Sequence, residues 1–379
     1  MKKVVVSEYV SFGHPDKIAD QIADALLDAY LMVDPETRSG IEVLIKDSTI
    51  VLGGEVKSNA IIDHESVVLG VMETFNFSDK HHLQPENLKI INLIGKQSPE
   101  INKGVEKGDN VIGAGDQGFM VGYASNKTPN YLPLGVYLSK VICQYISEYF
   151  IGVGPDTKSQ VIVDYSNETP VVKHILVSTM HTCSLETIKE IVTNNILSNW
   201  IDIDEKIFNK YIKYNKDLII DVNPCGSWEI GGPVADCGVT GRKIVVDQYG
   251  GYCNVGGGAF SGKDGESKVD RSGAYMARYI SKNIVAAGIS DTCKITLSYI
   301  IGVPEPSSIN IETEPSLYTD IIERFIRENI DLTPNGISNK FELTNPIYYK
   351  TARYGHFGNE SYPWEKLDLV DALKKEFIL

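Results

Sequence analysis

The chain has 379 residues, of which 42% are hydrophobic and 23% are charged, a composition typical of a globular protein with two or three packed domains. Its formal net charge of −14 at pH 7 repels nucleic acid and anionic lipid, so neither is expected as a partner of the surface as a whole. Any anionic ligand has to be small and held in a local basic pocket.

Signals for export, membrane insertion and cysteine-based sites are missing from the sequence. No apolar run approaches the roughly 20 residues that span a bilayer, and the run from Val4 to Val6 is too short for the core of a signal peptide. The six cysteines are scattered without Cys-x-x-Cys spacing, and we expect them to be reduced and mostly buried. The chain is therefore expected in the cytoplasm.

Strand-like alternation and amphipathic helical spacing interleave along the chain, which predicts an α+β or α/β architecture. A polar or glycine-rich turn precedes a long helix three times, near Gly13, Gly118 and Gly265. This rhythm indicates three related α+β units, although coincidence would produce it equally well. The expected elements are strand 4–8, a helix from Pro15, hairpin 41–56, a long loop at 95–118, helix 134–150, strands 159–164 and 171–178, helix 185–194, strand 243–247, helix 271–287, strand 294–301 and helix 316–329.

The first expected helix carries aspartates at every fourth position, Asp16, Asp20, Asp24 and Asp28. The last three are expected on a solvated face that also complements the helix dipole. Asp16 is different, because with His14 it lies at the helix entrance, where the N-terminus favours bound anions. A lone histidine at a helix start is more often a structural hydrogen-bonding group than a catalyst, so a phosphate or metal role is one of two readings.

The hairpin at 41–56 brings two carboxylates to one face. If Asp47-Ser48 is a two-residue turn, Glu42 faces Gly53 across the ladder and Glu55 follows two residues further along. The two carboxylates would then lie roughly 7–8 Å apart. Such a patch either faces water or binds a cation, and the sequence alone favours neither.

The glycine-rich stretch from Gly256 to Lys268 is expected to hold a polyphosphate. Its glycines and Lys263 have the spacing of a Walker A loop, in which backbone amides cradle phosphates and a lysine meets their charge. Asp264 breaks the match, since that motif needs Ser or Thr after the lysine. The lysines followed by Asp270 still make an anion site with a carboxylate for its metal. A mobile surface loop is the alternative for this segment.

The motifs of the chain resemble those of one family, S-adenosylmethionine synthase, also called methionine adenosyltransferase. They run in order along nearly the whole chain, so the resemblance is specific. The matching stretches are GHPDKIADQ at 13–21, GKQSP at 95–99, GAGDQG at 113–118, TGRK at 240–243, GGGAFSGKD at 256–264, KVDRS at 268–272 and YGHFG at 354–358.

The resemblance implies three structurally similar α+β domains with pseudo-threefold symmetry. The expected boundaries are 1–100, 113–229 and 230–379, with a mobile lid loop at 101–112. It also implies an enzyme that joins ATP to L-methionine, forming S-adenosylmethionine, phosphate and diphosphate. Two Mg²⁺ ions per site and one K⁺ per subunit would assist, in a homodimer or homotetramer with active sites at the subunit interface.

The resemblance assigns a role to each matching residue. The triphosphate would be held by His14, Lys158, Arg242, Lys243 and Lys263, and further ATP contacts match Asp116, Asp156, Ser227, Trp228, Asp236 and Ala259. Methionine would be held by Glu55, Gln97, Asp236 and Lys268, magnesium by Asp16 and Asp270, and potassium by Glu42.

The implied reaction needs no general base, because a thioether sulfur has no proton to lose. Its difficulty is the departing triphosphate, which requires dense positive charge aimed where negative charge develops. The chain departs from the family pattern at Phe12, where a Glu is usual, and at Ser227-Trp228, where Arg-Phe is usual. Trp228 can stack on adenine as Phe would, but Ser227 lacks the arginine charge, which predicts a weaker hold on ATP. The turn at 264–267 also looks longer than usual, which affects the placement of Lys268.

Two other functions stay open. A paralogue could bind nucleotide or S-adenosylmethionine as a sensor or partner subunit, although a sensor need not keep His14, Asp16, Lys158, Lys263 and Asp270 together. A P-loop ATPase is disfavoured by the aspartate that breaks the Walker match.

Overall fold

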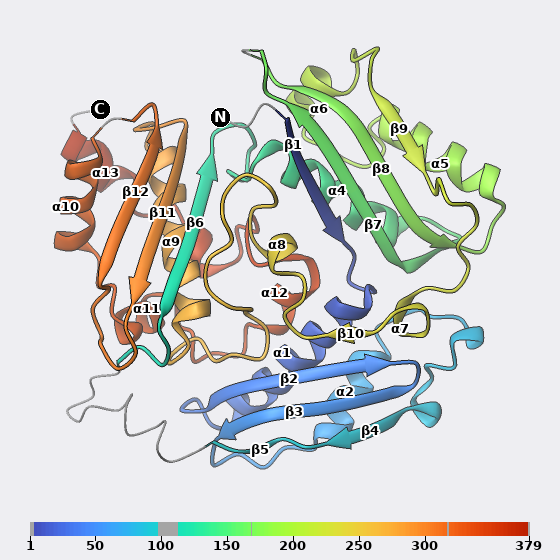
Figure 1. The fold of residues 1–379 in the computed structure, drawn as a ribbon, viewed down its shortest axis with the longest axis horizontal. Coiled ribbons are helices and arrows are strands. Elements are labelled where there is room, and N and C mark those ends of the chain that lie inside the picture. Colours follow the sequence, from blue (N-terminus) through green and yellow to red (C-terminus); the bar gives the residue numbers. More distant parts are fainter. Residues whose placement is uncertain (1–3, 98–112, 168, 317, 378–379) are drawn as a thin grey trace.

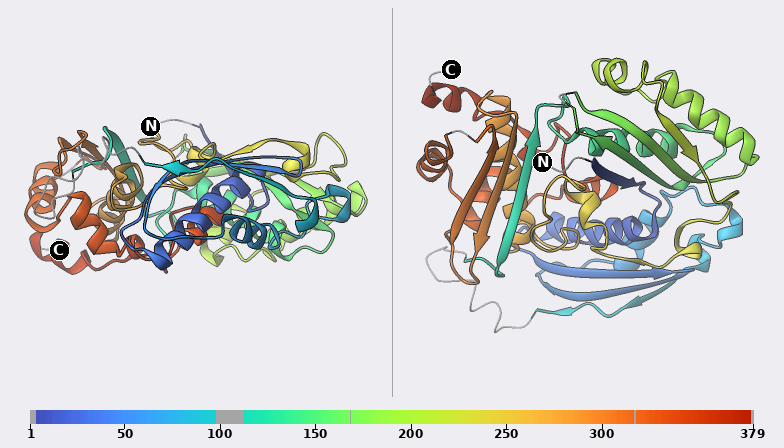
Figure 2. Two further views of the ribbon diagram at one scale, coloured as in Figure 1. Left: turned by 90° about the horizontal axis from the view of Figure 1, so that it is seen from below. Right: turned by 45° about the horizontal axis from the view of Figure 1, so that its top comes forward.

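The computed structural model describes residues 4–97, 113–167, 169–316 and 318–377. Three β-sheets lie on one broad face of a flat molecule, and the long helices pack behind them on the other face (Figures 1 and 2). The predicted lid loop at 101–112 lies outside the described residues. Within the described ranges, no helix is both long enough and apolar enough to cross a membrane.

Strands and helices alternate along the chain. The strands are β1 (Val4–Val10), β2 (Arg38–Lys46), β3 (Thr49–Lys57), β4 (Lys89–Asn92), β5 (Gly95–Lys96), β6 (Gly118–Ser125), β7 (Val153–Asp164), β8 (Val171–His181), β9 (Ile219–Val222), β10 (Gly238–Val239), β11 (Thr292–Tyr299) and β12 (Ser308–Glu314). The helices are α1 (Pro15–Val33), α2 (His64–Met72), α4 (Leu134–Tyr149), α5 (Leu185–Leu197), α6 (Glu205–Tyr211), α7 (Gly232–Ala235), α8 (Ile244–Asp247), α9 (Val269–Ala286), α10 (Thr319–Asn329), α11 (Pro334–Phe341), α12 (Tyr349–Tyr354) and α13 (Val370–Phe377).

Each sheet combines strands from distant parts of the chain. The strand orders are β1-β7-β8-β9, β10-β2-β3-β4 with β5 also paired to β3, and β12-β11-β6. The strand before each long helix belongs to a different sheet from the one which that helix covers. Thus β1 precedes α1, which packs on β2; β6 precedes α4, which packs on β7 and β1; and β10 precedes α9, which packs on β6 and β11. This exchange occurs three times and confirms an α+β fold of three structurally similar units with pseudo-threefold symmetry.

The apolar cores lie between each long helix and its sheet. Helix α1 begins at Pro15, whose ring suits the first helical position, and it buries Ile18 and Ile22 completely. Strand β11 buries every second residue, as expected for a strand with one face on the core. Residues Ile142 of α4 and Ile280 of α9 belong to one continuous core. Long apolar helices laid on pleated sheets therefore build the frame that carries the site.

The hairpin predicted at 41–56 is confirmed with its register. Strands β2 and β3 pair around Asp47-Ser48, which places Glu42 opposite Gly53 and Glu55 opposite Gly40. Asp47 has a positive φ of 51°, a conformation that Asp tolerates in tight turns. Glu42 and Glu55 therefore stand on the same face, as the sequence predicted.

Three sequence-based expectations are wrong. The segment expected as a strand at 243–247 forms helix α8 instead. The carboxylate of Asp247 in this helix accepts a hydrogen bond from the Lys17 ammonium at 2.7 Å. Two of the three aspartates expected on a solvated face of α1 are enclosed instead, since Asp20 and Asp24 are 0% exposed, and the third, Asp28, is partly buried. The six cysteines are all free, as expected, but they are not mostly buried. Two are buried, three are partly buried and one is exposed.

Candidate active site

His14 caps the entrance of α1 and is neutral. Its Nδ1 accepts a hydrogen bond from the backbone N–H of Asp16 at 3.1 Å, so the ring proton is on Nε2. Burial lowers the pKa of His14 to about 2, and the nearby Lys243 and Lys158 lower it in the same direction. His14 can therefore offer an N–H donor to an anion, while the positive charge of the site comes from its neighbours.

The carboxylate of Asp16 is the centre of a basic cluster. The backbone N–H of Val239 donates to Oδ1 at 2.9 Å, and the Lys243 ammonium donates to Oδ2 at 2.5 Å. Arg242 places Nη1 at 3.7 Å from Oδ1, with about half of its side chain exposed (53%). Lys158 joins them from β7, where it pairs with Val10 of β1, and its charge acts on His14. Residues from three segments thus form one cationic group around a buried carboxylate.

Asp156 lies beside this group with an unused acceptor. Its Oδ2 accepts from the backbone N–H of Gly232 at 2.8 Å, and its Oδ1 has no hydrogen-bond partner among the described residues. Burial raises the pKa of Asp156 to about 6, although the Gly232 hydrogen bond and the charge of Lys158 act in the opposite direction. A buried carboxylate oxygen without a partner is costly, so its presence here indicates a ligand contact.

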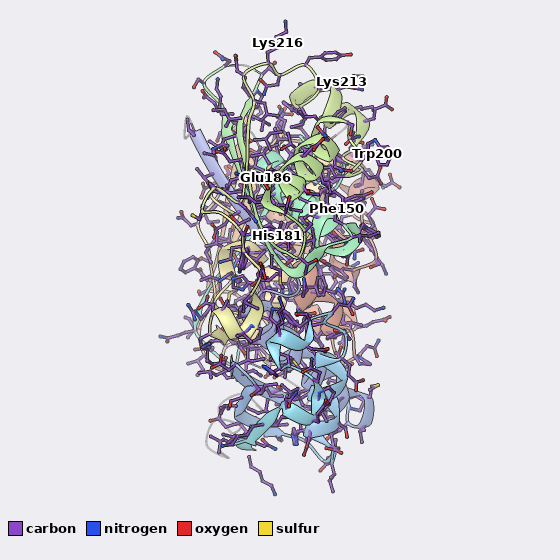
Figure 3. All side chains as sticks on the ribbon, turned by 90° about the vertical axis from the view of Figure 1, so that its right-hand side faces the viewer. Phe150, His181, Glu186, Trp200, Lys213 and Lys216 are labelled. Carbon is purple, nitrogen blue, oxygen red and sulfur yellow. The ribbon has the colours of Figure 1, made fainter. Side chains whose placement is uncertain are left out.

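Two hydrogen bonds join the backbone of Trp228 to His181, the last residue of β8. The Trp228 N–H donates to His181 Nε2 at 3.3 Å, and the Trp228 carbonyl accepts from the His181 N–H at 2.8 Å. The indole N–H donates to the Ile230 carbonyl at 2.7 Å, while Ser227 is exposed next to it. Figure 3 shows His181 near mid-height, whereas Lys213 and Lys216 lie at the far end of the molecule. Sequence reasoning missed His181, because its contact with Trp228 spans 47 residues.

The glycine-rich stretch carries a second charged group. Lys263 donates to Asp270 Oδ2 at 2.5 Å, with 22% of the lysine side chain exposed. A Cβ on Gly258 would lie 2.7 Å from both of these groups, so the loop can approach them only because this residue is glycine. Desolvation raises the pKa of Glu42, and the positive charge of Lys263 acts against it, which places the two near each other.

The two groups touch through their loops. A Cβ on Gly241, next to Arg242, would lie 2.4 Å from the Cβ of Ala259. Within the described ranges, no hydrogen bond or ion pair joins the charged members of the Asp16 group to Lys263 or Asp270. The structure therefore brings the groups next to each other without merging them into one network.

Four predicted site residues stand apart from both groups or make only local contacts. Asp116 is exposed and accepts from the neighbouring Gln117 N–H, and Glu55 is exposed on β3. Lys268 is the N-cap residue of α9 and is partly buried. The Oε1 atom of Gln97 is buried and unpartnered among the described residues, which leaves an acceptor for a ligand.

Phe12 stands where the family pattern has an acid, and it belongs to the apolar interior. Its ring stacks on Phe75 with centroids 5.7 Å apart, and the Arg353 guanidinium lies 4.2 Å above it. This position therefore contributes packing and a cation–π contact.

Sequence reasoning also missed what the aspartates of α1 do. Asp16, Asp20 and Asp24 accept backbone N–H groups from Val239, Gly241 and Gly262, the last two at 2.8 Å. Each acceptor thus anchors a loop that carries predicted site residues. The regular spacing of these aspartates was the available signal, but it equally fits a solvated helix face.

Asp20 also belongs to a buried charge cluster beneath these loops. The Lys17 ammonium lies 3.1 Å from Asp20 and 2.7 Å from Asp247. Burial raises the pKa of Asp20 to about 7 although Lys17 lowers it. Burial and the charge of Asp247 thus outweigh the effect of the lysine on the pKa of Asp20.

Comparison with known proteins places these features in one family. Models of the N-terminal, central and C-terminal domains of S-adenosylmethionine synthetase match residues 2–99, 111–228 and 230–366. The chain is 42% identical to the S-adenosylmethionine synthase of Mesoplasma florum over 384 residues, covering 99% of this chain and 100% of that protein. It is equally similar, at 42% over 385 residues, to the enzyme of Mycoplasma capricolum, covering 99% and 97%.

A solved structure shows the same likeness in three dimensions. It is described as an unusual S-adenosylmethionine synthetase from Campylobacter jejuni and superposes with a TM-score of 0.88 at 34% identity. The match covers 98% of this chain and 99% of the other.

Proposed function

The chain belongs to the S-adenosylmethionine synthetase family, and from this membership we propose that it is a methionine adenosyltransferase. It forms S-adenosylmethionine by attack of the methionine sulfur on the ribose 5′ carbon of ATP. The bound triphosphate is then hydrolysed to phosphate and diphosphate. The observation that carries the proposal is the pairing of Arg242 and Lys243 with Asp16 beside a neutral His14, on which the charge of Lys158 also acts.

This arrangement suits a departing triphosphate. Negative charge grows on the leaving oxygen as the carbon–oxygen bond breaks, and fixed cations stabilise it without reorganising. His14 offers its Nε2 proton to a phosphate oxygen, since its Nδ1 is already an acceptor. Lys263 extends the positive surface from the glycine-rich stretch. These residues assist the leaving group, and the sulfur needs no base.

The family is metal-dependent, and the chain has carboxylates that suit Mg²⁺. This ion usually takes one or two carboxylates together with waters and substrate phosphates. Asp16 and Asp270 each offer one carboxylate, already facing a lysine ammonium at 2.5 Å. Within the described ranges no cluster of three or more His, Cys, Asp or Glu side chains could hold a metal ion. Two Mg²⁺ ions shared with the triphosphate, and one K⁺ at Glu42, fit this donor set. Bound metal neutralises charge on the phosphates.

The remaining assignments concern substrate specificity. We propose that the adenosine is contacted by Asp156, through its unpartnered oxygen, and by Trp228, Ala259 and Asp116. Ser227 is proposed as a further ATP contact. Glu55, Gln97, Asp236 and Lys268 are proposed to hold methionine, and the buried acceptor of Gln97 supports its part in this. The family-model boundaries support a division of the chain near 1–100, 113–229 and 230–379. A lid at 101–112 is proposed from the family resemblance alone.

A homodimer or homotetramer with sites at the subunit interface fits the open face of the molecule. Apolar side chains stand exposed on strands of all three sheets, at Val4, Val6, Leu44 and Phe119. A second copy on this face would cover them and bring another set of site residues alongside. We place the enzyme in the cytoplasm, with ATP and L-methionine as its substrates and with neither nucleic acid nor membrane as partner. Sedimentation analysis tests the assembly directly.

One incubation tests the activity. The protein is supplied with ATP, methionine, Mg²⁺ and K⁺, and S-adenosylmethionine is measured by mass. Lys243→Met should abolish most of the product, whereas Lys216→Met, at the far end of the molecule, should leave it unchanged (Figure 3). Phosphate release without the sulfonium product would contradict the proposal and favour an ATPase, and ligand binding without turnover would favour a sensor.

A further inference from the structure

We propose that Asp24 and Arg271 are positioning residues, which as one buried ion pair hold the turn from Phe260 to Lys263 and so aim the Lys263 ammonium. Neither residue is a predicted ligand of substrate or metal. The inference rests on the proposed function, because it takes Lys263 as a contact of the triphosphate.

The contacts of the pair converge on that turn. Arg271 donates to both oxygens of Asp24, at 2.7 and 2.8 Å, and both side chains are 0% exposed. The same guanidinium donates to the carbonyls of Phe260 and Lys263, each at 3.0 Å. Asp24 also accepts the backbone N–H of Gly262 at 2.8 Å. One ion pair thus binds the backbone of the turn at three residues, Phe260, Gly262 and Lys263.

The pair also fixes the turn relative to the rest of the chain. Asp24 lies on α1, whose first turn carries His14 and Asp16, and Arg271 lies on α9 next to Asp270. On its other side the turn is bound by β2, where the N–H of Ile41 donates to the Gly262 carbonyl at 3.0 Å. Gly262 has a φ of +80°, a conformation that glycine adopts readily and other residues rarely adopt. Because the Asp24–Arg271 pair holds the backbone on both sides of this glycine, loosening the pair should displace Lys263.

The chain offers a matched control on the same helix. Arg278, seven residues after Arg271, makes an equally buried two-pronged pair with Glu365, at 2.9 and 3.0 Å. Glu365 also accepts one glycine N–H, that of Gly358, at 2.8 Å. Arg278 additionally donates to backbone carbonyls at 123, 130 and 131, none of which belongs to the predicted site. Glu365 also pairs with the buried Lys282 ammonium at 2.9 Å. The two arginine–carboxylate pairs share two-pronged geometry and burial, and they differ in the backbone that they hold.

The experiment compares Arg271→Lys with Arg278→Lys in the full-length enzyme. Lysine keeps the charge but loses the planar fork, so both variants should melt at lower temperature. Below those temperatures, Arg271→Lys should lower kcat on the order of 100-fold, since a small misplacement of a catalytic group has effects of that size. Arg278→Lys should keep kcat within about threefold, as for a site independent of the chemistry. Hydrogen exchange in the peptide 256–268 should accelerate only in Arg271→Lys.

Equal kcat and equal exchange in the two variants would overturn the inference. If the wild type forms no S-adenosylmethionine, the proposed function fails, while the exchange of peptide 256–268 still decides whether the pair positions the turn. Should Arg271→Lys not fold, the uncharged pair Asp24→Asn with Arg271→Gln replaces it, against Glu365→Gln with Arg278→Gln. The same two outcomes then apply.

Discussion

Helices α1 and α4 occupy equivalent places in two of the three units, yet their buried faces differ in chemistry. Helix α1 encloses Asp16, Lys17, Asp20 and Asp24. None of the fully buried residues of helix α4 is charged, and Ser139 is the polar exception among them. The partly buried Lys140 of α4 donates to the carbonyl of Phe357 at 3.0 Å. Both helices pack on a sheet. A long apolar helix is therefore sufficient to build a unit.

The difference indicates what the buried charges of α1 are for. Removing ions from water costs several kcal/mol per ion, and well-packed apolar residues often replace a buried ion pair without loss of stability. The aspartates of α1 bind loops that carry predicted site residues, whereas Lys140 of α4 binds the carbonyl of Phe357, which is not a predicted site residue. We infer that α4 serves mainly stability and α1 mainly function, and the following predictions can break or sharpen this division.

The largest effect is expected from Lys263→Met. Loss of one preorganised cation from a developing negative charge should lower kcat by roughly 100- to 1000-fold, or about 3–4 kcal/mol. Circular dichroism should show an unchanged fold, because 22% of this side chain is exposed. Lys340→Met, which breaks an exposed pair with Asp368, is the control and should change neither property. A kcat close to that of the wild type would contradict the proposed role of Lys263 in stabilising the triphosphate.

Ile142→Ala on α4 should affect stability instead. Ile142 is 0% exposed in the main core, so truncation should cost about 2–5 kcal/mol of unfolding free energy. Below the melting temperature, kcat should stay close to that of the wild type. Ile151→Ala, at a residue 98% exposed, should leave denaturant unfolding unchanged. A large fall in kcat of folded Ile142→Ala would break the division between α4 and α1.

Asp156→Asn should stabilise the protein at neutral pH while lowering its activity. The pKa of Asp156 is raised from its usual 3.8 to about 6 by burial, so between these values the folded state binds more protons than the unfolded state. Stability is therefore lost as pH rises through this window, by about 3 kcal/mol. The substitution should recover that stability above pH 6 and have no such effect near pH 4. A gain of equal size at both pH values would contradict the assignment to ionisation.

The smallest effect is expected from Ser227→Arg. An arginine next to Trp228 can reach the substrate phosphates, and at an exposed position it should lower the KM for ATP about fivefold, or about 1 kcal/mol. Ser198→Arg adds the same charge at an exposed residue outside the predicted site and is the matched control. An unchanged KM for ATP in Ser227→Arg, or an equal fall in both variants, would show that this departure from the family pattern carries no cost.

Much of the frame could be predicted from local sequence. Proline at the start of α1, apolar spacing in the long helices and the turn at Asp47-Ser48 are local signals, and they gave the helix start and the register that places Glu42 and Glu55 together. The segment 243–247 was wrongly predicted as a strand, because its run of β-branched residues is typical of strands. In the structure it forms a helical turn, whose Asp247 is hydrogen-bonded to Lys17, 230 residues away in the sequence.

The sequence by itself determined the family, the α+β class and the identity of the residues that the resemblance assigns to ATP, methionine and metal. Only the tertiary structure decided which of them meet, because the exchange of β1, β6 and β10 between sheets brings distant segments together. It also decided that Asp16, Asp20 and Asp24 of α1 are buried. The spacing of carboxylates on a helix is the same whether they face water or a guanidinium, and the partner of Asp24 lies 247 residues away. Burial depends on what packs against a face, which no local pattern records.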